Sequence, residues 1–578
     1  MATKTHQRRF LKRIMKILGV HIGHDSSAAL VVDGRIVADV AEERFTRTKH
    51  YAGLPIHSIE YCLKSQNLTM ADLDAVAVPA SMSVPDLNFL FDLKGAKREQ
   101  VTRKRQAFEL VREILKKPDI SPPLYIKNFP LHTRTEIIHV EHHLAHAASA
   151  YYTSGSREKQ LIVTIDGSGD SASAGIWRGE NGKITKLQTF PNAGSLGWFY
   201  SNVTEGLGWW HGDGEGKTMG LAPYGDHTKC QGVLDKFTPK YADGDLVEPH
   251  DFGRAGYWNE GGAIQWHFDE SYEIRDLIEK HGRENIAAEG QRVLEEQVKN
   301  LVFPWLEREG TRNLSASGGV MLNVKLNQRP WESGRIAKHH TYPNPGDSGL
   351  AVGAALYAYY SANPSAPIHA IEDLYWGPEY SDKEIEDALK LRRLEYRRVE
   401  DVAEYVAGKL AEGKICSWFQ GRMESGPRAL GARSILMSTA KPENKDIINA
   451  RVKFREAFRP FCPSMLWEKK EEYLEHSRDE FFMITSFTCK QSKRPRVPAV
   501  VHADGTLRPQ TVKKEFAPRF WNLLSAFEKL TGDSVLLNTS FNVMGEPIVN
   551  HPREAIRCFY DNGLDVLALG NFVLEKRV

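Results

Sequence analysis

Two segments of this 578-residue chain repeat one order of elements, and the repeat limits the fold more than any other feature. In the first segment, the strand "KILGVHI" is followed by the polar turn "GHDSSA" and the returning strand "AALVVDG". In the second, the strand "QLIVTID" ends in "GSGDSA" and another strand follows, over residues 160–179. Asp33 and Gly34 predict a tight hairpin turn into a third strand. Two such units predict a duplicated α/β architecture.

The turns and the helical patterns predict how the chain divides. In actin-like ATPase folds, a polar turn between two strands presents backbone N–H groups to phosphates. Apolar residues recur every three or four positions over residues 287–307, and "LAVGAALYAYY" predicts a helix that closes this half. Residues 361–370, "SANPSAPIHA", are the best linker candidate. We therefore expect an extension over residues 1–14, one domain over 15–362 and a second α/β domain over 363–578.

Composition and charge exclude some classes of function. Lys and Arg number 76 against 74 Asp and Glu, so the net charge of +2 gives no electrostatic argument for nucleic acid. No apolar run in the chain approaches the roughly 18 residues that a membrane helix needs. The six cysteines form no CxxC pair, which favours reduced thiols and a cytoplasmic location. We expect no nucleic-acid and no membrane partner. The oligomeric state stays open, with a homodimer as one alternative.

The stretch "EHHLAHAASAYY" places His142 and His146 four residues apart. On a helix this spacing puts both imidazoles on one face, where they can bind one metal ion. Asp166, at the end of a strand, and Asp347, before a helix, would complete a carboxylate-rich site suited to Fe(II), Zn or Mn. The same spacing also occurs on ordinary surface helices. From the residues alone, both interpretations remain open.

Glycine-rich segments before the linker are candidates for contact with a nucleotide. "GDGEGKTMGLAPYG" carries Lys217, but the phosphate-loop pattern needs a glycine five positions before Gly216, where His211 stands. A Walker-type loop is therefore disfavoured, while a surface loop and a nucleotide cleft lined by Lys217 both remain open. The turn at Gly318 and Gly319 would let a base and ribose approach the backbone closely.

The C-terminal part gathers basic residues in two glycine- or proline-containing segments. "GRMESGPRALGARS" and "NARVKFREAFRPFCPS" contain Arg422, Arg428, Arg433, Lys453, Arg455 and Arg459. Arginines beside bare backbone make bidentate phosphate sites, although arginine runs are more often solvated surface. The apolar strand "SVLLNTSFN" also ends in polar residues, including Asn538 and Ser540. Together these features predict a pocket for a highly phosphorylated small molecule.

Eight segments, in this order and over nearly the whole chain, resemble the carbamoyltransferases of the NodU/CmcH family. They are "HIGHDSSAALVVDG", "HHLAHAASAYY", "GEGKTMGLAPYG", "SGGVMLN", "NPGDSGLAVGAAL", "SGPRALGARSI", "NARVKFREAFRPF" and "LLNTSFNVMGEPI". The resemblance implies an α/β fold, with an N-terminal duplicated actin-like (ASKHA, TsaD-like) domain and a C-terminal YrdC-like α/β domain. It also implies ATP-dependent O-carbamoyl transfer, as in antibiotic and other secondary-metabolite pathways.

The resemblance further assigns roles to residues of this sequence. It places a metal, Fe(II) in this family, on His142, His146, Asp166 and Asp347. The acceptor-side histidine falls on His24, which would act as the base. Carbamoyl phosphate and ATP with Mg²⁺ would bind Arg428, Lys453, Arg459, Arg508, Asn538 and Ser540, with Arg428 and Lys453 acting in catalysis. The adenosine of the resulting adenylate would lie against Gly318, Gly319 and Asn323.

The implied reaction has two steps, and two alternative functions remain beside it. Carbamoyladenylate would form from carbamoyl phosphate and ATP, and the carbamoyl group would then pass to a hydroxyl of a small-molecule acceptor. A modifying enzyme of the tRNA threonylcarbamoyl-adenosine type is one alternative, which the near-zero net charge disfavours. A non-catalytic actin-like nucleotide-binding protein is the other, and it would not need the second basic pocket. The sequence does not identify the acceptor.

Overall fold

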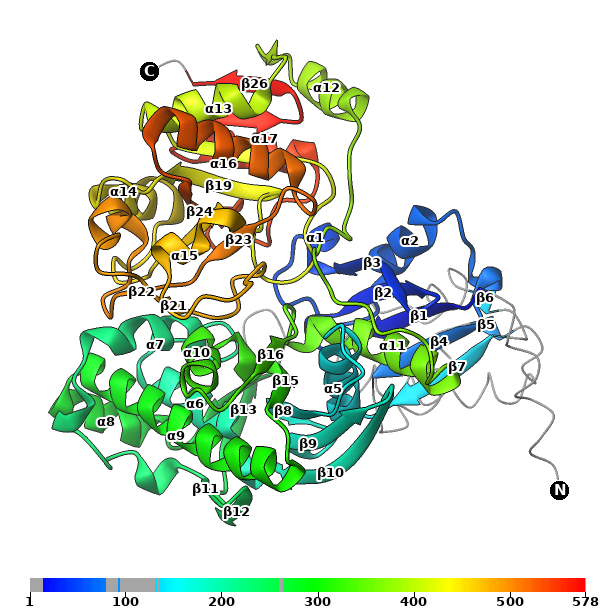
Figure 1. Cartoon of the computed structure of the whole chain (residues 1–578), viewed down its shortest axis with the longest axis vertical. Helices are drawn as coiled ribbons and strands as arrows, with labels where there is room; N and C mark the ends of the chain where they lie inside the picture. Colours follow the sequence, from blue (N-terminus) through cyan, green and yellow to red (C-terminus); the bar gives the residue numbers. More distant parts are fainter. Residues whose placement is uncertain (1–13, 80–91, 94–129, 132–134, 259–263, 577–578) are drawn as a thin grey trace.

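The computed structural model describes residues 14–79, 92–93, 130–131, 135–258 and 264–576. Apart from Ile14, the extension expected over residues 1–14 lies outside these residues. The described chain forms two five-stranded sheets and one eight-stranded sheet, with helices packed on and between them (Figure 1). The eight-stranded sheet belongs to the C-terminal part, drawn in yellow to red, and lies across both smaller sheets.

The first sheet contains the hairpin that the sequence predicts. Its strands are β1 (Lys16–His21), β2 (Ser27–Val32), β3 (Arg35–Ala41), β4 (Ala75–Pro79) and β7 (Glu136–Val140), in the order β3-β2-β1-β4-β7. Asp33 and Gly34 have φ of 47° and 76°, so both central residues of the turn are left-handed, as a tight hairpin between twisted strands requires. The predicted turn is confirmed.

The second sheet repeats this topology. Its strands are β8 (Gln160–Gly169), β9 (Ala172–Glu180), β10 (Lys183–Pro191), β15 (Asn313–Ser317) and β16 (Lys338–Thr341), in the order β10-β9-β8-β15-β16. As in the first sheet, an antiparallel three-stranded unit continues into two parallel strands. The predicted duplicated, actin-like architecture is confirmed.

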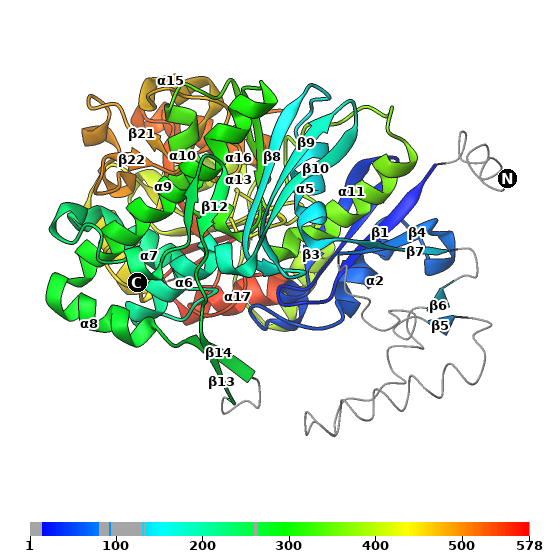
Figure 2. The same ribbon diagram turned by 90° about the horizontal axis from the view of Figure 1, so that it is seen from below.

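Two helices join the halves between the sheets. Helix α5 (His142–Tyr152) packs on β8 and β15, and α11 (Leu350–Ala362) packs on β1, β2 and β4. Figure 2 shows the two helices side by side. A Cβ on Gly353 would lie only 1.9 Å from the carbonyl oxygen of Ala145, so glycine permits this close crossing. The crossing fixes where α5 begins, and therefore where its histidines lie.

Further helices cover the second half. They are α6 (Leu196–Gly206), α7 (Glu215–Leu221), α8 (Ser271–His281), α9 (Arg283–Glu309) and α10 (Val324–Glu332). The helix predicted over residues 287–307 is confirmed as part of α9. Among the described helices, none combines the length and apolar character needed to cross a bilayer.

The eight-stranded sheet carries helices on both faces. Its strands are β17 (Arg397–Arg398), β26 (Phe572–Glu575), β25 (Val566–Leu569), β18 (Cys416–Phe419), β19 (Arg433–Ser438), β24 (Val535–Ser540), β20 (Cys462–Leu466) and β23 (Gln510–Val512), in this spatial order. One core includes α13 (Val402–Ala411) and α16 (Pro518–Thr531), and the other includes α12 (Asp382–Leu391) and α17 (Pro552–Asp561). The expected second α/β unit is confirmed. The division at residues 362 and 363 remains our proposal.

Arginine side chains connect the first sheet to the C-terminal part. Arg422 donates to the carbonyl oxygen of Val37 at 3.0 Å. In the opposite direction, Arg47 donates to the carbonyl oxygens of Pro547 at 2.6 Å and Ile548 at 2.7 Å. Sequence analysis grouped Arg422 with phosphate-binding arginines, and this expectation is corrected: its guanidinium is used to join the two parts.

A buried carboxyl group lies in the same interface. Asp39, in β3, is 1% exposed; Oδ2 accepts from the Ser425 hydroxyl, and Oδ1 has no hydrogen-bond partner among the described residues. Burial raises the pKa of Asp39 to about 7. Because the folded pKa lies above the unfolded one, this carboxyl favours the fold at low pH and the benefit disappears as the pH rises through about 7.

We expect Asp39→Asn to stabilise the protein already at pH 5, where the unfolded carboxyl is ionised and the folded one must be held protonated, and to stabilise it by about 2 kcal/mol more at pH 8. The neutral amide avoids the cost of a buried charge, a cost that wild-type protein escapes only when Asp39 is protonated. Urea denaturation at both pH values measures the difference, with exposed Asp387→Asn as the control. An equal gain at pH 5 and pH 8 would contradict the assignment.

Candidate functional site

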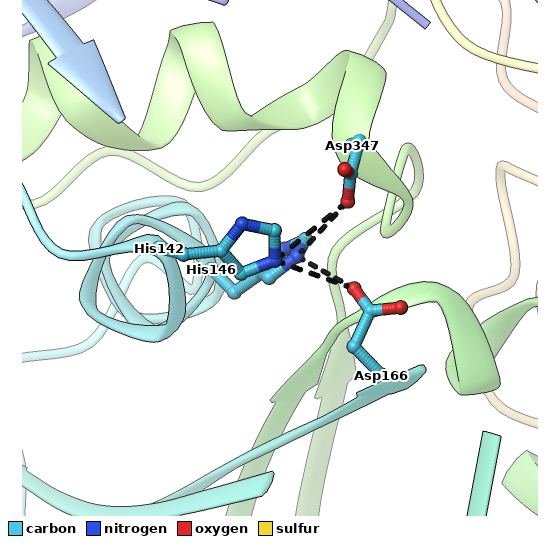
Figure 3. Close-up of side chains that lie close together, drawn as sticks. All are labelled: His142, His146, Asp166 and Asp347. Carbon is cyan, nitrogen blue, oxygen red and sulfur yellow. Dashed lines mark hydrogen bonds and ion pairs between the residues drawn. The ribbon is translucent and has the colours of Figure 1, made fainter. Parts of the chain in front are cut away.

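Helix α5, the end of β8 and the start of the short helix η8 (Asp347–Gly349) bring four side chains together (Figure 3). His146 Nε2 lies 3.0 Å from Oδ2 of Asp166 and 3.6 Å from Oδ1 of Asp347. His142 Nε2 lies 3.6 Å and 3.7 Å from the same two oxygens. We call these residues the four-residue cluster. It contains all four metal ligands named from the sequence.

The cluster has the donors that a divalent cation requires. One ligand atom of each residue lies within 4.8 Å of the others. Nε2 of His142 is buried and makes no hydrogen bond to any residue in the described part of the chain. Burial opposes the charge on His146, yet Asp166 and Asp347 raise its pKa to about 9. Two imidazoles and two carboxylates around one point suit Fe(II), Zn(II) or Mn(II).

The glycine turn that was predicted to contact a nucleotide lies directly beside Asp166. Gly318 has φ of 100°, and a Cβ there would lie 2.2 Å from the carbonyl oxygen of Ile165. A Cβ on Gly319, the first residue of η7 (Gly319–Leu322), would lie 3.0 Å from Oδ1 of Asp166. Side chains are therefore excluded here, because the glycine backbone packs directly against the end of β8 that carries Asp166.

Asn323, also expected to contact adenosine, already has partners for its side-chain amide. Its oxygen caps α10 by accepting from Leu326 N at 3.0 Å, and its nitrogen donates to Gln291 at 2.9 Å. A side-chain contact with a nucleotide would require these bonds to be exchanged. The role of Asn323 stays a prediction.

His24 lies at the open edge of the four-residue cluster. Its side chain is 70% exposed, and Nε2 lies 3.2 Å from Oδ2 of Asp347. Nδ1 lies 3.1 Å from Oδ2 of Asp25. The hydrogen bond to Asp25, together with the charge of Asp347, raises the pKa of His24 to about 9. The residue named as acceptor-side base thus combines solvent access with proximity to the cluster.

A second polar site lies in the C-terminal part, around Lys453. Its buried Nζ donates to Oδ1 of Asn542 at 2.7 Å and to Oγ of Ser540 at 3.2 Å. Burial, with Arg455 nearby, lowers the pKa of Lys453 to about 7. Asn538 is also buried, and its Oδ1 has no hydrogen-bond partner among the described residues. Sequence analysis named Lys453, Asn538 and Ser540, and the structure places them along the end of β24.

Arginines surround this lysine. The basic cluster comprises Lys453, Arg428, Arg455, Arg459 and Arg508. Burial, together with the charge of the neighbouring guanidinium groups, lowers the pKa of Arg428 and of Arg455 to about 9. Arg508 donates to Sγ of Cys462, and Nε of Arg428 has no hydrogen-bond partner in the described chain. Mutually repelling, poorly paired cations of this kind form a site for a polyanion.

Two basic residues from the sequence analysis have different surroundings. Arg433 is fully buried, lies over the ring of Phe419 and donates only to backbone carbonyls, so its grouping with the phosphate-binding arginines is corrected. Lys217 lies on α7, not on a loop, and pairs with Glu456 of the C-terminal part at 3.5 Å. Its expected contact with a nucleotide stays a prediction.

Sequence analysis did not find the cavity that separates the two parts beside the basic cluster. Its water-accessible volume is about 40 Å³, and Arg508 and Phe461 line it from the C-terminal part. Tyr224 and Lys325 line it from the actin-like part. Because the lining residues are far apart in sequence and carry no shared motif, only the packing of the two parts reveals the cavity.

Comparison with known proteins assigns the family. The model described as Carbamoyltransferase N-terminus matches residues 16–356, and that described as Carbamoyltransferase C-terminus matches residues 407–576. Nodulation protein NolNO of Sinorhizobium fredii is 37% identical, covering 96% of this chain and 79% of its own. Nodulation protein NolO of Bradyrhizobium diazoefficiens is 36% identical, covering 76% of this chain and 79% of its own.

Solved structures add little to this assignment. A crystal structure of full-length HypF in its phosphate- and nucleotide-bound form is 14% identical and has a TM-score of 0.33. The matched region covers 60% of this chain and 55% of the HypF chain. The family matches, in contrast, extend over nearly the whole sequence. The chain therefore belongs to the carbamoyltransferase family, and it is an enzyme that transfers carbamoyl groups.

Proposed function

We propose that this enzyme is an ATP-dependent O-carbamoyltransferase that forms carbamoyladenylate at the basic cluster and uses it at the four-residue cluster. The acceptor would be a hydroxyl group of a small molecule of secondary metabolism, such as an antibiotic precursor. The observation that carries the proposal is the presence of two separate polar sites in one chain. One suits polyphosphates, and the other combines metal-binding donors with an exposed histidine.

At the basic cluster, the first step needs stabilisation of phosphate charge. Water hydrolyses carbamoyl phosphate to carbamate and inorganic phosphate, and a carbamate oxygen then attacks the α-phosphorus of ATP while pyrophosphate leaves. Lys453 and Arg428 would neutralise the phosphoryl oxygens in the transition state, where fixed cations are most effective. Arg459, Arg508 and Ser540 would hold the two substrates, with Mg²⁺ carried by ATP.

At the four-residue cluster, the second step needs a deprotonated hydroxyl group. His142, His146, Asp166 and Asp347 would hold a divalent cation, which we propose to be Fe(II), and this ion would supply Lewis acidity. His24 would take the hydroxyl proton at Nε2 as the hydroxyl oxygen attacks the carbamoyl carbon and AMP leaves. The adenosine would lie against the backbone at Gly318 and Gly319, directly beside Asp166.

The donor step can be tested without knowing the acceptor. We expect the purified protein, given ATP, Mg²⁺ and carbamoyl phosphate, to release pyrophosphate and to form a species with the mass of carbamoyl-AMP. His24→Asn should leave both products unchanged and block transfer, because the residue lies outside the basic cluster. Absence of pyrophosphate from folded, metal-loaded protein would disprove the donor step.

A further inference from the structure

A continuous series of polar contacts extends from His24 to the opposite half of the actin-like part. Oδ2 of Asp25 lies 3.1 Å from Nδ1 of His24, and its other oxygen, Oδ1, lies 2.7 Å from Nδ1 of His50. Nε2 of His50 lies 3.6 Å from Oδ1 of Asp213, which also pairs with Lys49. One carboxylate therefore holds two imidazoles, and the second imidazole reaches another carboxylate.

The contacts join elements of different halves. His24 and Asp25 form the turn between β1 and β2, and His50 follows the short helix α1 (Glu43–Thr46); all three belong to the first half. Asp213 lies in the second half, in the connection from α6 to α7. The series thus closes only when this connection lies against the first half.

The local backbone is shaped for these contacts. Asp25 and His50 have φ of 58° and 53°, a left-handed conformation that is uncommon outside glycine. The backbone N of His50 also donates to Glu43 at 3.1 Å, which fixes the loop. Asp213 and Asp25 raise the pKa of His50 to about 10, so this ring donates from both nitrogens at neutral pH.

We propose that Asp25 and His50 are positioning residues that fix the ring orientation and tautomer of His24, and that Asp213 anchors them from the opposite half. This inference rests on the proposed role of His24 as the acceptor-side base. Asp25 holds Nδ1 of His24 and directs Nε2 to the edge of the four-residue cluster. Once Nε2 has lost its proton, the proton that remains on Nδ1 is held by Asp25, and Nε2 presents its lone pair to the acceptor hydroxyl. A carboxylate that orients a histidine base in this way is a recurring arrangement in hydrolases.

Asparagine at position 25 would separate this role from simple packing. Asp25 accepts one hydrogen bond at each oxygen, whereas an asparagine has a single acceptor oxygen and a donor NH₂. Because His50 donates only, it would take the oxygen of the asparagine, and the NH₂ would face Nδ1 of His24. His24 would then carry its proton on Nε2, where it cannot act as a base. If the His50 ring is also removed, the side-chain oxygen of the asparagine is free to accept a hydrogen bond from Nδ1 of His24.

The experiment uses water as the probe nucleophile. AMP released from carbamoyladenylate is measured in full-length, metal-loaded enzyme, and the rate of His24→Asn is subtracted as the uncatalysed background. We expect Asp25→Asn to lower the remaining rate by about 100-fold, less than the loss known for a triad aspartate. The double variant Asp25→Asn/His50→Ala should regain about 10-fold. His57→Ala, at a 58% exposed histidine outside the series, is the control.

A second readout does not depend on turnover. Hydrogen-bonded imidazole N–H protons give low-field proton resonances in NMR spectra. The His24 resonance should disappear in His24→Asn, and the His50 resonance should disappear in His50→Ala. In Asp25→Asn, the His24 resonance should shift. Any one of three results would overturn the proposal. They are unchanged AMP release in Asp25→Asn, no recovery of the rate in the double variant, and a wild-type rate equal to that of His24→Asn. Pyrophosphate release separates the two failures: its absence in wild-type protein rejects the proposed function, and its persistence restricts the failure to the positioning residues.

Discussion

Lys453→Met is expected to slow pyrophosphate release by about 1,000-fold, because it removes a fixed cation from the phosphate-binding site. Nζ of Lys453 is held by Ser540, the last residue of β24, and by Asn542 just beyond it. Burial lowers its pKa to about 7, and a bound polyanion would favour the charged form. Methionine keeps most of the volume and loses the charge. Initial rates with saturating ATP and carbamoyl phosphate measure the effect.

The control must separate lost chemistry from lost folding. Lys441→Met removes a lysine from an exposed position before α14 (Glu443–Ile448), outside the basic cluster, and should retain the wild-type rate. Arg428→Gln provides an independent test, because its guanidinium belongs to the same cluster but to a different loop. Thermal denaturation checks that each variant is folded. A folded Lys453→Met protein with near wild-type pyrophosphate release would exclude Lys453 from the donor step.

Asp166→Asn is expected to lower metal content and to reduce water-dependent AMP release by at least about 100-fold, while pyrophosphate release continues. Asparagine keeps the shape of the side chain and the bond from Gly167 N to Oδ1, but it removes one of two buried negative charges. Metal analysis of the purified protein measures the first effect, and separate assays of AMP and pyrophosphate measure the second.

The matched control is His139→Gln, which changes an exposed histidine on β7 just before helix α5 and should bind metal normally. If Asp166→Asn retained both metal and AMP release, the four-residue cluster would not be the metal centre. If pyrophosphate release fell in parallel with AMP release, the two sites would not be chemically separate. The expected pattern, with loss at one site only, distinguishes a two-site enzyme from a single composite site.

Local patterns were sufficient to predict the duplicated sheets and the composition of the four-residue cluster. The strand and turn spacings define both halves, and the four-residue spacing of His142 and His146 defines one face of α5. Asp347 is more than 180 positions from Asp166, so spacing does not connect them; their places at a strand end and before a helix made both candidates, and the resemblance to a family then assigned both to the metal. Sequence could not separate Arg433, which donates to backbone carbonyls, from Arg428, which lies in the basic cluster. Both are arginines near glycines, and only tertiary packing distinguishes their partners.

The contacts between Asp25, His50 and Asp213 were equally hidden. Asp25 is adjacent to a predicted site residue, and Asp213 lies in the glycine-rich segment "GDGEGKTMGLAPYG", but His50 is in no motif and nothing in the sequence connects the three. Their roles depend on left-handed backbone at Asp25 and His50, and on contact between two halves that are distant in sequence. Periodicity and spacing do not record either property.

The arginine contacts between the two parts have a consequence for how such enzymes diversify. Arg422 donates to the main-chain carbonyl of Val37, and Arg47 donates to those of Pro547 and Ile548, so the side chains at these three positions can change without breaking the bonds. Arg47 also pairs with Glu554 at 3.3 Å, and this contact does depend on a side chain. Each arginine must persist, while the side chains at the three carbonyl positions are free to drift. Under the proposed function, these backbone-directed bonds would place little constraint between the part that carries the donor site and the part that carries the acceptor site, whereas side-chain pairs such as Asp39 with Ser425 would have to be kept together. Recombination between distant relatives should be tolerated at this boundary between the two parts wherever the two arginines are inherited.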